Sequence, residues 1–330
     1  MRALAVKLTE DALIAAIAET IGQPVRTLRV GIGDDAAAWQ PNAHHLALAT
    51  TDTLVDGVHF RLAATPPDML GRKALAENLS DIAAMGGSPT VALVAMGITK
   101  QIDEPWIRSF YRGMAALAAE ARCAIAGGDI VRAPALTIGV TVVGEVRRSS
   151  LRLRSGAKPG DLAAVTGPLG LAAGGLRLLE AGKKDDAAPP IRAYLTPAPR
   201  LAEGKFLGSR RAVSAMMDVS DGLSTDIARM ARASHVDAIV DAGKLFVHPS
   251  LRQLGVDATD LILNGGDDYE LLVAIDARAY PHVARTFQRR FGRPLSAIGR
   301  FEIGSGNVWL ETGGRREPLP ARGYDHLNRL

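Results

Sequence analysis

Aspartate beside or near glycine recurs along most of this 330-residue chain. Glycine lets the backbone turn sharply and approach a ligand closely, and aspartate is a short, hard oxygen ligand suited to Mg²⁺. Carboxylates that converge on one cleft repel one another unless cations lie between them. The pattern therefore predicts a site for divalent metal and polyphosphate, built from loops that are far apart in the sequence. Four segments place aspartate directly beside glycine: Gly33-Asp34-Asp35, Gly127-Gly128-Asp129, Asp218-Val219-Ser220-Asp221-Gly222 and Gly265-Gly266-Asp267-Asp268. Two further aspartate segments, Thr50-Thr51-Asp52-Thr53 and Asn78-Leu79-Ser80-Asp81, join them in the prediction.

The length of the chain favours two domains over one. Hydrophobic residues make up 47% of it, which is enough for large cores, but aromatics are only 5%. The cores should therefore consist mainly of Ala, Val, Leu and Ile. Residues 145–160 carry several arginines, a proline and two glycines, which is typical of a domain junction. We expect an α/β or α+β protein with domains at residues 1–147 and 148–330.

Several classes of protein are disfavoured by composition. The formal charge is only +4 and the basic pairs are scattered, so a nucleic-acid partner is not expected. The lone Cys123 cannot form an intramolecular disulfide, which fits a reducing cytoplasm and a buried, inert thiol. Acidic residues interrupt the apolar residues 1–22, so an amphipathic helix is expected there, not a signal peptide. No uncharged apolar run approaches the roughly 18 residues of a membrane span.

Hydrophobic periodicity and punctuation by Gly and Pro predict the local elements. Asp52 is expected at the tip of a strand, because the apolar run before it ends in polar residues. Gly127-Gly128-Asp129 should lie between two strands, and Asn78 and Asp81 should share one face of a helix. The expected helices are 10–21, 67–85, 104–121, 199–207 and 223–233. The expected strands are 27–30, 45–51, 91–98, 124–126, 136–143, 162–166, 239–240, 269–275 and 296–300.

Two motifs compete with the metal-site interpretation. Residues 31–36 match a dinucleotide fingerprint, but Pro41 follows too closely for a helix to start there, and two carboxylates would repel a pyrophosphate. Residues 218–229 resemble a calcium-binding loop, but its twelfth position holds Arg229 instead of Glu. Asp218 and Asp221 could share a metal from one helical turn, or Ser220 or Asp221 could merely cap the following helix. The Walker A and protein-kinase motifs are absent, so a nucleotide would be held by metals and turns.

Four further residues each have an ordinary structural explanation. A lone histidine such as His59 is most often structural or at the surface, and Tyr111 and Tyr324 would by default be packing residues. Arg154 alternates with leucines, as on an exposed strand. A functional role for these residues therefore needs support from their wider sequence context.

In order and spacing, the motifs together resemble the thiamine-monophosphate kinase family. This family lies within the ATP-binding superfamily of aminoimidazole-ribonucleotide synthetase, selenophosphate synthetase and a hydrogenase maturation protein. The resemblance covers nearly the whole chain from Val30 onward. The elements Asp268-Tyr269-Glu270-Leu271 and Gly323-Tyr324-Asp325-His326 favour the thiamine branch. Other matching segments are Gly31-Ile32-Gly33-Asp34-Asp35, Thr51-Asp52-Thr53-Leu54-Val55, Gly57-Val58-His59-Phe60, Lys73-Ala74-Leu75-Ala76, Asn78-Leu79-Ser80-Asp81, Gly127-Gly128-Asp129, Arg154-Ser155-Gly156-Ala157 and Asp218-Val219-Ser220-Asp221-Gly222.

The resemblance implies an N-terminal sheet flanked by helices, a C-terminal α/β sandwich, and a homodimer in which the N-terminal sheets pair. It implies Mg²⁺-dependent transfer of a phosphoryl group from ATP to thiamine monophosphate, giving ADP and thiamine diphosphate. By likeness, the metal ligands are Asp34, Thr50, Thr51, Asp52, Asp81, Asp129, Asp218 and Asp221, of which Asp52 and Asp129 are the most critical. The ATP contacts are Tyr111, Gly128, Arg154 and Ser220, and the substrate contacts are His59, Glu270 and Tyr324.

The predicted reaction needs no general base, because the phosphate monoester that accepts the phosphoryl group has a second pKa of about 6 and is mostly a dianion at neutral pH. Two alternatives remain open from the sequence. One is another ATP-dependent enzyme of the same superfamily, and the other is a non-catalytic metal-binding protein.

Overall fold

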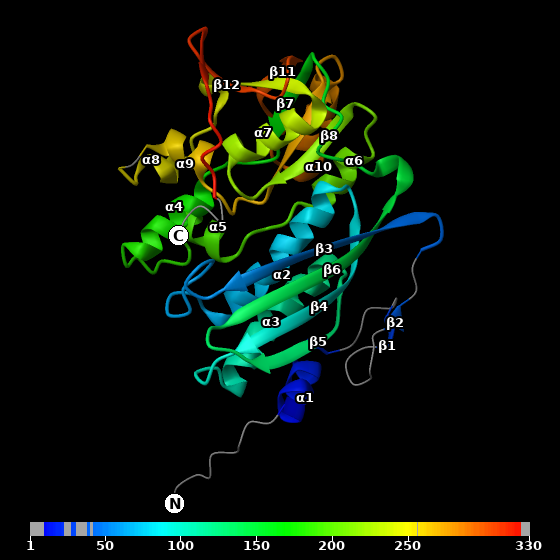
Figure 1. Ribbon diagram of the computed structural model, residues 1–330, viewed down its shortest axis with the longest axis vertical. Coiled ribbons are helices and arrows are strands. Elements are labelled where there is room, and N and C mark those ends of the chain that lie inside the picture. Colours follow the sequence, from blue (N-terminus) through cyan, green and yellow to red (C-terminus); the bar gives the residue numbers. More distant parts are fainter. Residues whose placement is uncertain (1–9, 23–27, 31–37, 40–41, 256, 325–330) are drawn as a thin grey trace, which may run out of the picture. The chain divides into compact units, whose positions relative to one another are not determined.

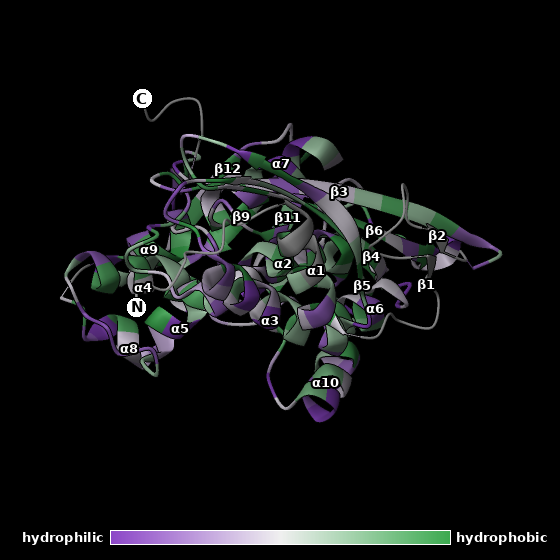
Figure 2. Cartoon of the chain, turned by 90° about the horizontal axis from the view of Figure 1, so that it is seen from below, coloured by the Kyte–Doolittle hydropathy of each residue, from purple (hydrophilic) through white to green (hydrophobic). Residues whose placement is uncertain are grey.

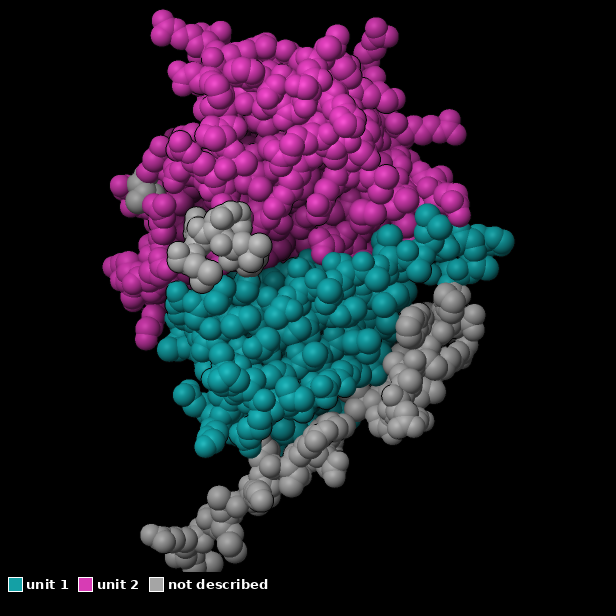
Figure 3. Space-filling view, viewed as in Figure 1, with its two compact units in different colours: residues 1–79, 89–145 teal, residues 80–88, 146–330 magenta. Residues whose placement is uncertain are grey.

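The computed structural model describes residues 10–22, 28–30, 38–39, 42–255 and 257–324. The chain divides into two compact units (Figure 3). Unit 1 comprises residues 1–79 and 89–145, and unit 2 comprises residues 80–88 and 146–330. No helix within the described ranges combines the length and apolarity that crossing a bilayer requires.

Unit 1 is built on a four-stranded sheet in the order β3-β6-β4-β5 (Figure 1). Alternate residues of β6 are buried, so one face of the sheet is covered and the other is open. Helices α2 and α3 lie on the covered face (Figures 1 and 2). The strands are β1 (Leu28–Val30), β2 (Ala38–Trp39), β3 (His45–Val55), β4 (Ser88–Ile98), β5 (Ala124–Arg132) and β6 (Thr137–Arg147), and the helices are α1 (Glu10–Ile21), α2 (Pro67–Ala84) and α3 (Glu104–Ala121).

Glycine sets how closely α2 and α3 approach. A Cβ added at Gly71 would lie 1.9 Å from the carbonyl oxygen of Phe110, and one added at Gly113 would lie 1.8 Å from that of Asp68. The carboxylate of Asp103 accepts a hydrogen bond from the amide of Trp106 and so caps α3. These local features fix the helical layer that covers the sheet.

Unit 2 contains a seven-stranded sheet in the order β13-β12-β9-β11-β7-β10-β8. Its strands are β7 (Asp161–Val165), β8 (Val213–Val219), β9 (Val236–Asp241), β10 (Glu270–Asp276), β11 (Ser296–Ile303), β12 (Val308–Thr312) and β13 (Arg315–Pro318). Its helices are α4 (Leu171–Glu180), α5 (Pro189–Leu195), α6 (Leu201–Gly208), α7 (Leu223–Ser234), α8 (Pro249–Arg252), α9 (Ala258–Asn264) and α10 (Tyr280–Phe291), with 3-10 turns η1 (Arg148–Ser150) and η2 (Ala242–Lys244).

Successive side chains of the central strands of unit 2 point to opposite faces of the sheet and therefore pack in different cores. Met217 packs in a core with residues of α7 and α9, whereas its neighbour Met216 packs in a second core with residues of α6 and α10. Both cores rely on aliphatic side chains, although Phe287 and Phe301 are fully buried. Helices therefore cover both faces of this sheet, which fits the predicted sandwich.

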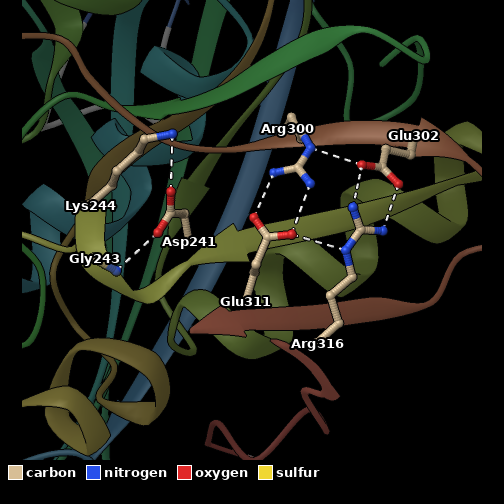
Figure 4. Close-up of polar contacts among 7 residues, drawn as sticks. All are labelled: Asp241, Gly243, Lys244, Arg300, Glu302, Glu311 and Arg316. Carbon is tan, nitrogen blue, oxygen red and sulfur yellow. Dashed lines mark hydrogen bonds and ion pairs between the residues drawn. The ribbon is translucent and has the colours of Figure 1, made fainter. Parts of the chain in front are cut away.

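Four charged side chains on β11, β12 and β13 of unit 2 form a cluster (Figure 4). Arg300 on β11 and Arg316 on β13 each pair with both Glu302 and Glu311. Hydrogen bonds from the two arginines lower the pKa of Glu311 to about 2. Because the Arg300–Glu311 and Arg316–Glu302 pairs are bidentate and belong to one network, they link the three strands more firmly than isolated surface pairs would.

The predicted helices 10–21 and 104–121 are confirmed, and Cys123 is buried with a pKa raised by burial to about 12. The predicted strand tip at Asp52 is wrong, because β3 continues to Val55. The predicted loop at Gly127-Gly128-Asp129 is also wrong, since these residues lie within β5, paired in parallel with β4. The strand expected around Arg154 is absent from the described structure.

Candidate functional site

Three segments that the sequence singled out meet in unit 2. The turn 218–222, which comprises the last two residues of β8 and the residues before α7, accepts hydrogen bonds from two other segments through its backbone oxygens. The amides of Asp267 and Tyr269 donate to the oxygens of Ser220 and Val219, at 2.8 and 2.9 Å. The amide of Tyr324 donates to the oxygen of Asp221 at 3.0 Å. The fold therefore brings together residues about 50 and 100 positions apart, as the metal-site hypothesis requires of this half.

Glycine permits these close approaches. A Cβ added at Gly266 would lie 2.6 Å from the oxygen of Ser220, and one added at Gly323 would lie 1.9 Å from the oxygen of Asp221. Real Cβ atoms do not come so close to backbone oxygens. At this site, the glycines near the aspartates are therefore required because backbone segments pack too closely for a side chain.

Asp218 lies at the buried end of β8, with only 4% of its surface exposed. The hydroxyl of Ser80 donates to its Oδ2 at 2.7 Å. Burial is the main cause that raises the pKa of Asp218 to about 7; the nearby Asp81 carboxylate adds to the rise, while Ser80 and Arg154 oppose it. A buried carboxylate beside a second one favours a bound cation.

Asp221 does not cap the following helix. The N-cap of α7 is Gly222, which has no side-chain hydrogen bond, so the capping explanation for Ser220 or Asp221 is wrong. The idea of one helical turn shared by Asp218 and Asp221 is also wrong, because Asp218 belongs to β8. The Asp221 carboxylate instead accepts a hydrogen bond from Arg229 at 2.5 Å.

Asp226 is a site residue that the sequence reasoning missed. Its Oδ2 accepts hydrogen bonds from the amides of Ser220 and Asp221, both at 3.1 Å, and its Oδ1 accepts one from Arg229 at 2.8 Å. Burial, followed by the Asp221 charge, raises the pKa of Asp226 to about 6. The only sequence feature that marks Asp226 is its place in the first turn of a helix, directly after the acidic segment 218–222.

Glu270 lies at the start of β10 with 2% exposure. Its Oε2 accepts from Thr166 at 2.6 Å and from the Nε of Arg200 at 2.9 Å. Its Oε1 pairs with the Nη2 of Arg200 and, at 3.5 Å, with Arg293. The carboxylate is thus held inside a protein network, and the sequence reasoning missed its arginine partners.

The loop before β10 has an unusual backbone. Asp267 and Tyr269 adopt left-handed conformations with φ of 67° and 51°, which cost non-glycine residues of order 1 kcal/mol each. The hydroxyl of Tyr269 donates to Asp267 at 3.0 Å. Asp268 between them accepts from the amides of Gly170 and Ala172 at the start of α4, and burial raises its pKa to about 8. Strain held by such contacts is typical of a functional loop.

In unit 1, Thr50, Thr51 and Asp52 lie on β3, whereas Gly128 and Asp129 lie on β5. These are the two outermost strands of the sheet. At about 4.8 Å per strand, the two sets are separated by at least roughly 14 Å. Asp52 and Asp129 of one chain therefore cannot ligate the same ion.

Two more predicted residues of unit 1 have structural contacts. The Nδ1 of His59 accepts a hydrogen bond from the amide of Val55 at 3.0 Å, which fixes the ring within a tight turn. Tyr111 is 3% exposed, packs edge-on against Phe110, and has a pKa raised by burial. Asp34 lies outside the described residues.

The predicted metal is chemically compatible with unit 2. In the described part of the chain, no three His, Cys, Asp or Glu side chains form a cluster that could hold a metal ion. Mg²⁺ does not require such a cage, because it usually binds one or two carboxylates and completes its shell with water and substrate phosphates. Asp81 and Asp218 supply hard oxygen donors whose mutual repulsion a cation would relieve.

Comparison with known proteins defines the class to which this chain belongs. Residues 33–146 match the N-terminal domain of AIR synthase related proteins, and residues 158–307 match their C-terminal domain. Thiamine-monophosphate kinase of Bacillus subtilis (strain 168) is 35% identical over 305 residues, covering 90% of this chain and 93% of the relative. The chain belongs to the thiamine-monophosphate kinase family.

Solved structures agree with this assignment. The crystal structure of thiamine-monophosphate kinase from Stenotrophomonas maltophilia K279a is 38% identical, with a TM-score of 0.83 and coverage of 93% of this chain and 98% of that one. A structure of AaThiL complexed with AMPPCP and TMP is 30% identical, with a TM-score of 0.75 and coverage of 99% and 100%. The predicted fold class and family are therefore confirmed.

Proposed function

We propose that this chain transfers the γ-phosphoryl group of ATP to thiamine monophosphate, giving ADP and thiamine diphosphate. The observation that carries the proposal is the meeting of the turn 218–222, the loop 265–269 and the tail 323–324 in unit 2. Family membership supports the choice of substrates, because one relative was solved with AMPPCP and TMP.

The transfer is direct and in line, without a phosphoenzyme. The acceptor is already mostly dianionic at neutral pH, since its second pKa is about 6, so no side chain has to remove a proton. Mg²⁺ held by Asp81 and Asp218 would supply positive charge that offsets the repulsion between the two phosphates. The task of the protein is to hold two anions in line, and Arg154 adds a guanidinium that can contact phosphate bidentately.

Each predicted residue takes one role in this proposal. Glu270 is assigned to the substrate side by likeness to the family, and its carboxylate is bound by Arg200 and Arg293. The ring of Tyr324 lies against the thiazolium, a contact worth roughly 0.5–2 kcal/mol. The proposed metal ligands are Asp34, Thr50, Thr51, Asp52, Asp81, Asp129, Asp218 and Asp221; the ATP contacts are Tyr111, Gly128, Arg154 and Ser220; and the substrate contacts are His59, Glu270 and Tyr324.

We also propose a cytoplasmic homodimer that pairs the N-terminal sheets. The open face of the unit 1 sheet supports this, because Leu93 is 38% exposed and Val131 is 53% exposed. Green, hydrophobic stretches run along β3 (Figure 2). A second copy that covers this face would remove the apolar surface from water.

Incubation with Mg-ATP and thiamine monophosphate, followed by chromatography, tests the function. We expect thiamine diphosphate and ADP in equal amounts, and no product when free thiamine replaces the monophosphate. Conversion of free thiamine would indicate a pyrophosphokinase instead. Binding of ATP without any product would indicate a non-catalytic protein.

A further inference from the structure

Three consecutive residues in the first turn of α7 each bind a segment of the proposed site. The hydroxyl of Ser224 donates to the Oδ1 of Asn264, just before the loop 265–269, at 2.7 Å. The Oγ1 of Thr225 accepts a hydrogen bond from the amide of Gly323 at 3.0 Å. Asp226 accepts from the amides of Ser220 and Asp221. Successive side chains of a helix point about 100° apart, so the start of α7 touches three neighbours on different sides.

These contacts are not ordinary helix capping. The N-cap of α7 is Gly222, so the amides of Ser220 and Asp221 that Asp226 binds precede the helix. The amide of Gly323, which Thr225 binds, belongs to a segment 98 residues away in sequence. The side chains at the start of α7 therefore stabilise the backbone of other segments instead of the helix itself.

We propose that the first turn of α7 positions the site: Thr225 and Asp226 hold the tail 323–324 and the turn 218–222 in one fixed arrangement. This inference rests on the proposed function, because it concerns the distance between the proposed substrate contact, Tyr324, and the proposed metal ligands Asp218 and Asp221. Neither residue is among the proposed contacts to metal, ATP or substrate. Thr225 acts through Tyr324, and Asp226 acts through Ser220 and Asp221.

The packing of Gly323 explains why a hydroxyl at Thr225 is needed. A Cβ built on Gly323 would lie 1.9 Å from the oxygen of Asp221 and 2.5 Å from the Oγ1 of Thr225. Gly323 therefore packs between the backbone of Asp221 and the side chain of Thr225. The next amide, that of Tyr324, donates a hydrogen bond to the backbone oxygen of Asp221. A movement of Gly323 on Thr225 would carry Tyr324 with it.

Hydrogen exchange tests the positioning without relying on catalysis. Thr225→Val keeps the side-chain shape but loses the acceptor, so the amides of Gly323 and Tyr324 should exchange faster, while Thr225→Ser should preserve their protection. The matched control is Thr286→Val on α10, where the hydroxyl donates within its own helix to His282 at 3.0 Å. Unchanged protection in Thr225→Val would overturn the proposal.

Kinetics then tests whether the positioning matters for the reaction. Thr225→Val should raise the KM for thiamine monophosphate about two- to tenfold, the range set by one hydrogen bond, with the KM for ATP and the melting temperature unchanged. Asp226→Asn keeps an acceptor oxygen but loses the Arg229 pair, and it should lower kcat more than either KM.

A double-mutant cycle separates positioning from a general loss of stability. Tyr324→Ala should raise the KM for thiamine monophosphate, and adding Thr225→Val to it should have no further effect, because Thr225 acts through Tyr324. Additive effects would overturn the proposal. If the wild-type protein makes no thiamine diphosphate while its tail is protected through Thr225, the proposed function fails and the structural coupling stands.

Discussion

Asp129→Asn and Asp52→Asn should each lower kcat by about 100-fold or more while the fold persists. A metal ion contributes several kcal/mol of charge stabilisation in phosphoryl transfer, and each 1.4 kcal/mol corresponds to a factor of about ten. Asparagine has nearly the size of aspartate but lacks its charge. The two residues lie on opposite outermost strands of the unit 1 sheet. In the proposed site they therefore cannot ligate the same ion from one chain, and each variant should be impaired by itself.

The matched control for this prediction is Asp186→Asn, which changes an exposed aspartate in the loop after α4. Steady-state kinetics and thermal unfolding should be measured for all three variants. The control should retain wild-type turnover. Near-normal turnover in Asp52→Asn or Asp129→Asn would remove that residue from the proposed metal ligands.

Gly323→Ala should lower kcat/KM for thiamine monophosphate by about 10- to 100-fold, equivalent to a loss of roughly 1.4–2.8 kcal/mol. The new Cβ would lie 1.9 Å from the backbone oxygen of Asp221, so the tail must move away. That movement breaks the bonds from Gly323 to Thr225 and from Tyr324 to Asp221. Overpacking of this kind acts through displaced backbone, and here the displaced backbone carries a proposed substrate contact.

Gly243→Ala is the control for the effect of adding a methyl group. Gly243 lies in η2, where the nearest atom to an added Cβ is the Oδ1 of Asp241 at 3.3 Å (Figure 4). A flexible side chain can give way by that small amount, so activity should remain at the wild-type level. Gly323→Ala with wild-type kinetics would show that the position of the tail does not affect the reaction.

Local sequence signals predicted the elements whose boundaries have local causes. Helix α3 begins with the Asp103 cap and Pro105 in its first turn, and both features can be read from the sequence. The polar residues Thr51-Asp52-Thr53 predict that the strand ends there, whereas β3 continues to Val55 because it pairs with β6 in the sheet. Helix α10 was missed because it is rich in charge, with only Val283 and Phe287 buried.

The motifs at the proposed site could be found from the sequence, but their supporting contacts could not. Glu270 stood out within Asp-Tyr-Glu-Leu, whereas Arg200 and Arg293 are two of many arginines until the fold brings them to its carboxylate. Similarly, Asp226 gains its role only when the turn before α7 folds back over it. Sequence patterns identify the segments of a site more readily than the long-range contacts that hold them.

Electron paramagnetic resonance with Mn²⁺ tests the central claim most directly. In the presence of AMPPCP and thiamine monophosphate, the wild-type protein should bind Mn²⁺ beyond the amount held by the nucleotide alone. Asp129→Asn in unit 1 and Asp218→Asn in unit 2 should each weaken that binding by about tenfold or more, since each removes an anionic oxygen donor. Mn²⁺ binding that is the same in both variants as in the wild type would contradict the account.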